Sequence, residues 1–121
     1  MPTNTRALMR QREGMDLRFN KISDIEPGVL SHLHSLRSLL LNDNRLRELV
    51  SGTFDGLRKL KYLYLYRNRI QYIEQDVFQG LEHLEQLTFT VERNPPLCNI
   101  AKYIAATNKI NVSCFIVPER I

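Results

Sequence analysis

The sequence lacks the features that mark membrane proteins and secretory precursors. Its 121 residues contain no tryptophan, and no apolar run approaches the length of a transmembrane helix. The residues from Met1 to Arg6 do not form the apolar core of a secretory signal. The chain is therefore expected to be either intracellular or a mature form without its leader.

Patterns for catalysis and for metal or nucleic-acid binding are also missing. The five glycines are scattered and form no phosphate-binding loop, and the net charge of +4 comes without a dense basic run. The histidines have no spacing suited to a metal site or to a nucleophile and its base; they are His32, His34 and His83. We expect a protein that is not an enzyme, with no cofactor, no metal and no nucleic-acid partner.

The strongest pattern in the sequence is a repeat with a period of 24 residues. The stretch Leu60–Ile70 reads L-x-x-L-x-L-x-x-N-x-L, and asparagines recur at Asn20, Asn44 and Asn68. Seven apolar columns share this period; one holds Leu30, Phe54 and Phe78. Because a single unit cannot bury its own leucines, the units must stack. The sequence predicts a short right-handed α/β repeat solenoid with a concave parallel sheet and a C-terminal helical cap.

The predicted boundaries place the repeats at 15–94, between a degenerate N-terminal cap or first strand at 1–14 and a cysteine-containing cap at 95–121. For the start, an uncovered first coil and a short strand over 6–10 are equally favoured. The fourth unit is predicted to form a strand over 87–91. In the C-terminal cap we expect an amphipathic helix over 97–107 and an extended segment over 112–117.

Side chains that alternate with the buried leucines are expected to line the concave face. Tyrosine and arginine often dominate binding interfaces, so three tyrosines on one strand favour a binding surface over a strand that merely suits aromatics. The predicted ligand-binding residues are Arg18, Phe19, Leu40, Asn42, Tyr62, Tyr64, Tyr66, Arg67 and Thr88.

A second pattern is a basic ladder, in which a cation follows each repeat-asparagine position: Lys21, Arg45, Arg69 and Arg93. Stacked coils would hold these like charges roughly 5 Å apart. Asp24 and Glu48 can compensate Lys21 and Arg45, and the position is usually solvated. We favour a solvated surface over a site for an anionic glycan or microbial-surface polymer.

The 24-residue repeats and the Asn94-Pro-Pro-Leu-Cys98 entry into a C-terminal cap resemble those of extracellular leucine-rich repeat proteins, and the repeats are similar to those of peroxidasin-type and Slit-type matrix proteins. A short array closed by a cysteine-containing helical cap also resembles variable lymphocyte receptors of jawless vertebrates and their chordate relatives. In the cap, Ile100 replaces a second family cysteine and Tyr103 lies near the place of a family tryptophan. An N-terminal cysteine cap is missing.

By themselves the two cysteines could be reduced thiols or a disulfide; the resemblance implies a disulfide between Cys98 and Cys114, and so an oxidising, extracellular location. Asn111 lies in the sequon Asn111-Val-Ser113 and is the glycosylation candidate. The resemblance also implies a secreted or cell-surface module that recognises protein or glycan ligands, with a role in innate immunity. The alternative is a matrix-adhesion module that acts by self-association as a homodimer.

Overall fold

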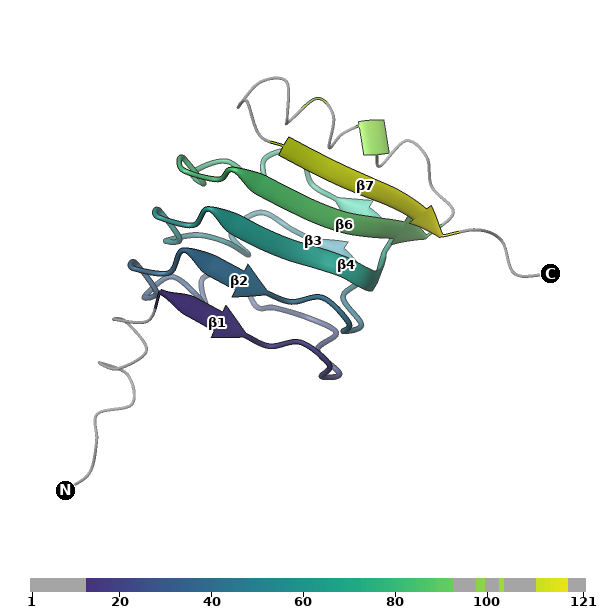
Figure 1. Ribbon diagram of the computed structural model, residues 1–121, viewed down its shortest axis with the longest axis horizontal. Helices are drawn as coiled ribbons and strands as arrows, with labels where there is room; N and C mark the ends of the chain where they lie inside the picture. Colours follow the sequence, from purple (N-terminus) through teal and green to yellow (C-terminus); the bar gives the residue numbers. More distant parts are fainter. Residues whose placement is uncertain (1–12, 93–97, 100–102, 104–110, 118–121) are drawn as a thin grey trace.

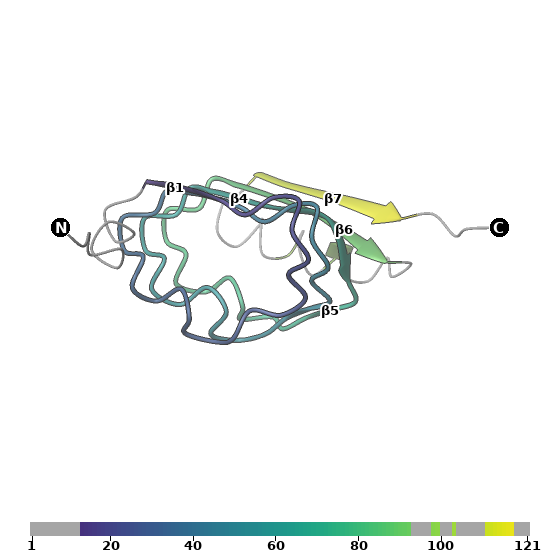
Figure 2. The same ribbon diagram turned by 90° about the horizontal axis from the view of Figure 1, so that it is seen from below.

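The computed structural model describes residues 13–92, 98–99, 103 and 111–117. The chain winds into a β-solenoid whose main wall is a five-stranded parallel sheet in the order β1-β2-β4-β6-β7 (Figure 1). Its strands are β1 (Gly14–Asp16), β2 (Ser38–Leu40), β4 (Tyr62–Ile70), β6 (Gln86–Glu92) and β7 (Asn111–Val117). The opposite wall carries a two-stranded sheet of β3 (Glu48–Leu49) and β5 (Tyr72–Ile73) (Figure 2).

The strand register confirms the 24-residue repeat. Gly14 pairs with Ser38, Ser38 with Tyr62, and Tyr62 with Gln86, so each coil stacks on the next in the same register. This register turns the repeat leucines inward, where Leu39 and Leu63 are fully buried. On the far side of the core, the rings of Phe54 and Phe78 stack with centroids 6.0 Å apart, as the aromatic column predicted.

The repeat asparagines join neighbouring coils inside the solenoid. The side-chain amide of Asn68 donates to the carbonyls of Leu41 in the preceding coil and Leu65 in its own coil, at 3.0 Å each. Its side-chain oxygen accepts from the backbone N–H of Leu46 at 3.0 Å. Asn44 makes the same kind of contacts one coil earlier. These amides satisfy buried backbone groups where the chain leaves the sheet.

Turns form the convex side, and some neighbouring turns pack against each other more closely than others do. Gly56 has a positive φ of 87°, and a Cβ there would lie 2.6 Å from the Cα of Ser31 in the preceding coil. Gly80 has the same φ, yet a Cβ there would meet nothing within 4 Å. A hollow of about 270 Å³ lies between these two turns, lined in part by Gly56 and Gly80. The second and third convex turns are therefore further apart than the first and second.

Of the predicted α/β repeat solenoid, the repeats and the parallel sheet are confirmed. Residues 13–92 contain no helix, because the convex connections are tight turns. Most of the helix predicted over 97–107 lies outside the described residues. So do the predicted strand or uncovered coil at 6–10, Arg93, and the turn before Asn94. The domain boundaries at 1–14, 15–94 and 95–121 remain predictions.

The last two strands extend the sheet beyond the regular repeats. The strand predicted over 87–91 is confirmed as β6, and its pairing with β4 becomes irregular after Leu65 and Phe89. The predicted extended segment is confirmed as β7, which also pairs in parallel with β6. A disulfide joins Cys98 to Cys114 in β7, with Cα atoms 5.7 Å apart. The cystine therefore ties the final strand to the end of the core.

Candidate functional site

The concave face has its aromatic centre on β4. Tyr62 is 36% exposed, and Tyr64 and Tyr66 are half-buried, with their ring centroids 6.3 Å apart. The hydroxyl of Tyr64 donates to the side-chain oxygen of Gln86 on β6 at 3.3 Å. Alternation along the strand explains this arrangement, because the intervening leucines point into the core. The three tyrosines form one surface in the middle of the sheet, which we call the tyrosine row.

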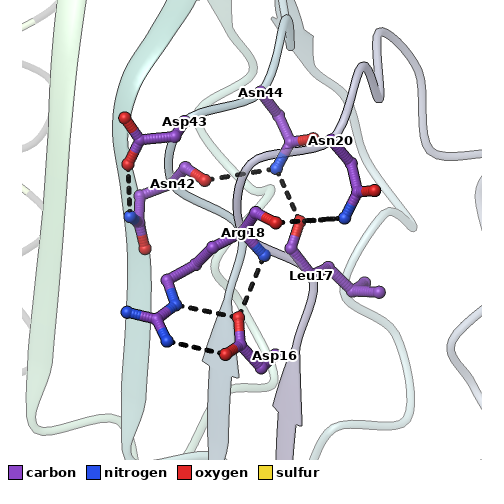
Figure 3. A network of polar contacts seen from close by, with 7 residues as sticks. All are labelled: Asp16, Leu17, Arg18, Asn20, Asn42, Asp43 and Asn44. Atoms are coloured by element: carbon purple, nitrogen blue, oxygen red, sulfur yellow. Dashed lines mark hydrogen bonds and ion pairs between the residues drawn. The ribbon is translucent and has the colours of Figure 1, made fainter.

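An ion pair lies on the same face at the first coil (Figure 3). The guanidinium of Arg18 donates to both carboxylate oxygens of Asp16, at 2.8 and 2.7 Å. The Arg18 side chain and its backbone N–H together lower the pKa of Asp16 to about 2. The same guanidinium lies 6.0 Å from the ring centroid of Phe19. Arg18 is thus held in place at one margin of the concave face.

Phe19 is both exposed and in an unusual backbone conformation. Its side chain is 72% exposed and its φ is 57°, in the left-handed region that disfavours residues with a Cβ. The equivalent positions in the next two coils, Asp43 and Arg67, have φ values of 61° and 55°. Aspartate tolerates this region well, whereas phenylalanine and arginine do not. This conformation recurs at the same position in the first three coils, so it does not depend on a phenylalanine there.

Polar contacts surround the tyrosine row on the side of the strand ends. Arg67 and Asp43 form an ion pair at 3.4 Å, and the side-chain amide of Asn42 donates to Asp43 at 2.6 Å. Asn42 is only 2% exposed. Within the described part of the chain, the other side-chain atom of Asn42, Oδ1, and the hydroxyl of Thr88 are buried without a hydrogen-bond partner. The concave wall therefore holds its polar atoms in a partly satisfied network.

All nine predicted ligand-binding residues lie on the concave strands or the turns that follow them, but they differ in exposure. Arg18, Phe19, Tyr62 and Arg67 are exposed. Leu40, Tyr64, Tyr66 and Thr88 are partly exposed, and Asn42 offers almost no surface. Three polar partners were missed: Asp16, Asp43 and Gln86. Each occupies the same repeat column as a predicted residue, so the period could have identified them.

The basic ladder lies on a flank of the solenoid and lines a hollow of about 500 Å³. Its lining residues are Ser23, Asp24, Arg45, Arg47, Glu48 and Arg69. Among the described residues, Lys21 forms no ion pair with Asp24, and Arg45 forms none with Glu48, although both were expected. The ladder is nevertheless a mixed-charge surface, because two carboxylates share it. Arg93 lies outside the described residues.

Asn111, the glycosylation candidate, begins β7, and its side chain is outside the described part. In the described part of the chain, no group of histidine, cysteine or acidic side chains could hold a metal ion. No helix found there is long and apolar enough to cross a bilayer.

Comparison with protein families finds leucine rich repeats over residues 12–46 and 36–90. Together these ranges cover β1 to β5 and most of β6. Comparison with curated proteins finds no match.

Proposed function

Because this chain belongs to the leucine-rich repeat family, whose solenoids generally serve as scaffolds for protein interaction, we propose that it binds a protein ligand through its concave face. The site would be the tyrosine row with its margins at Phe19, Arg18 and Arg67. Glycans are the second ligand class that such a face suits.

The single observation that carries this proposal is the tyrosine row. Three tyrosines lie next to one another on the central strand, and each retains exposed surface. Tyrosine offers a large, rigid contact area with a polar end, so it gains binding energy at a low cost in conformational entropy. The core does not require any of the three rings, because the leucines between them fill it.

Phe19 supports the same face independently. A large apolar side chain that is 72% exposed in a left-handed conformation is unfavourable in the free protein. Contact with a ligand would remove this apolar surface from water. Phe19 follows β1, whose Asp16 pairs with Leu40 of β2 and so shares a column of the concave wall with Tyr64.

The proposed location is outside the cell, either secreted or at the cell surface. The Cys98–Cys114 disulfide supports an oxidising compartment. The sequence resemblance to variable lymphocyte receptors favours a role in innate-immune recognition, with microbial surfaces among the targets.

The second candidate function is self-association through the first coil. In the described part of the chain, β1 pairs with β2 on one side only, and its other edge has no strand partner among these residues. A homodimer of this kind would suit a matrix-adhesion module. Sedimentation equilibrium at micromolar concentration would show a dimer; a monomer at all concentrations would exclude this candidate.

The test of concave recognition compares two exposed tyrosines on opposite walls. The full chain is screened against panels of extracellular proteins and of microbial and sulfated glycans, and each binder is measured against Tyr64→Ala and Tyr72→Ala. Tyr72 lies on β5 and is 50% exposed, so it controls for the loss of a surface ring. Tyr64→Ala should weaken binding by more than about 1 kcal/mol, and Tyr72→Ala should leave it unchanged.

Alanine at all three positions of the tyrosine row should abolish measurable binding. Circular dichroism and thermal melting establish that each variant is folded. If every binder tolerated the triple alanine variant, recognition would have to lie elsewhere on the molecule.

A further inference from the structure

A cleft, separate from the two hollows described above, lies next to the residues that precede β2 and β4. These strands begin on the left of the sheet in Figure 1. Its volume is about 220 Å³, and its lining residues are Arg37, Lys59, Lys61 and His83. Arg37 directly precedes β2, and Lys61 directly precedes β4. We call this the basic cleft.

The repeat brings these side chains together from three successive coils. Lys61 follows Arg37 by 24 residues, and His83 follows Lys59 by 24, so the four residues occupy two neighbouring columns. Backbone hydrogen bonds fix the stacking, because the N–H groups of Lys61 and Tyr62 both donate to the carbonyl of Arg37, at 2.8 and 3.0 Å. Adjacent coils in such a ladder lie about 4.8 Å apart.

Among the described residues, none that lines the basic cleft is acidic, in contrast to the ladder hollow with Asp24 and Glu48. Glu13 and Glu85 occupy the two ends of the Arg37–Lys61 column. Across the described residues, however, the only ion pairs are Arg18–Asp16 and Arg67–Asp43, so neither glutamate forms an ion pair with a residue of the cleft. Three permanent cations, those of Arg37, Lys59 and Lys61, thus line the cleft without an acidic residue beside them in its described lining.

We propose that the basic cleft binds a sulfate ester of a sulfated oligosaccharide. Arginine and lysine side chains from two adjacent coils can donate to several oxygens of one tetrahedral oxyanion. His83 adds a ring N–H donor from the third coil. A linear glycan lying across the coils would therefore meet a hydrogen-bond donor at each step. In the oxidising compartment that the disulfide supports, sulfated glycans are abundant polyanions. This inference shares the proposed extracellular location but does not use the tyrosine row.

The experiment measures binding of a fully sulfated heparin octasaccharide to the full chain by calorimetry at pH 7. Two double variants lose the same charge: Lys59→Gln with Lys61→Gln, and Arg45→Gln with Arg69→Gln. The first pair lines the basic cleft and the second lines the mixed-charge hollow. The first should weaken binding at least tenfold, and the second less than threefold. Equal losses would show attraction to net charge alone and would overturn the site.

Three further measurements distinguish a sulfated glycan from polyanions in general. The desulfated octasaccharide should not bind, and His83→Gln, at an exposed position, should weaken binding even if a lysine variant is poorly folded. Polyphosphate of matched charge should bind more weakly; tighter binding would overturn the assignment to a sulfated glycan. Tyr64→Ala should leave octasaccharide binding unchanged, which keeps this result separate from that of the concave face.

Discussion

At Phe19 the backbone adopts a conformation that is unfavourable for the side chain it carries, and that side chain is exposed. The left-handed conformation at its position costs a residue with a Cβ roughly 1–2 kcal/mol, and asparagine much less. The same conformation recurs at Asp43 and Arg67, so the solenoid geometry imposes it. The phenylalanine side chain therefore lowers stability at a place where its ring faces solvent.

Phe19→Asn is expected to raise the free energy of unfolding by about 0.5–1 kcal/mol, because asparagine tolerates the backbone conformation. The same variant should weaken binding of any concave-face ligand. Urea denaturation and the binding screen measure the two effects. Phe19→Leu is the matched control, since leucine keeps the backbone strain and should bring no gain in stability. A less stable Phe19→Asn protein would contradict the strain argument.

The carboxyl group of Asp16 provides a pH-dependent probe of the concave margin. Its folded-state pKa is about 2, below the ordinary value of 3.8, because Arg18 stabilises the charged form. Its contribution to stability is therefore complete above about pH 4 and is lost as the pH falls through about 2. The contribution is small, since both side chains are exposed.

A carboxyl-detected NMR titration should place the Asp16 midpoint near 2. Arg18→Gln should move the midpoint towards 3.8, because it removes the charged donor. An Asp16 midpoint that is unchanged in the Arg18→Gln variant would mean that the ion pair does not persist in solution.

For single residues, the sequence predicts the position on the solenoid better than it predicts the exposed fraction of the side chain. The 24-residue period placed all nine candidate residues on the concave wall. It did not predict that Asn42 would be buried, with its side-chain amide donating to the neighbouring Asp43. Nor did spacing within one coil identify the basic cleft, whose lining residues come from three coils.

Among the structural elements, the turn after each strand depends on its asparagine. Asn68→Ala would leave the buried N–H of Leu46 without its partner, which should cost about 1–3 kcal/mol. Asn20 is the matched control, because it is exposed and, among the described residues, donates only to carbonyls of its own coil, those of Leu17 and Arg18. Asn20→Ala should cost less than about 1 kcal/mol.

Urea unfolding of the two variants measures this difference. Equal losses would mean that the links between coils add nothing to the contacts within a coil. The chemical change is identical in the two variants, whereas the two asparagines differ in burial and in their connection to the neighbouring coil.

The positions of the strands follow from the pattern of apolar residues within the repeats, but the arrangement outside the repeats does not. Alternating leucines predict β4, and the extended segment predicted over 112–117 is confirmed as a strand. Its place as the fifth strand of the main sheet could not be predicted, since it lies outside the repeat period. The convex turns are too short to form the helices that the α/β class implies.

For the whole molecule, the disulfide acts as a clamp on the last strand. Replacing both Cys98 and Cys114 with alanine should lower the free energy of unfolding by about 3 kcal/mol, because the closed segment no longer restricts the unfolded chain. Amide hydrogen exchange should then accelerate in β7 first and leave the pairing of β2 with β4 protected. Uniform acceleration would mean that the solenoid unfolds as one unit.

The unequal spacing of the convex turns has a consequence for how the molecule deforms. The turns around Gly56 and Gly80 are separated by a hollow, whereas the Gly56 turn touches the coil before it. We expect the array to bend most easily at this gap, which lies behind the tyrosine row. A ligand pressed against those rings would be gripped by bending of the wall itself.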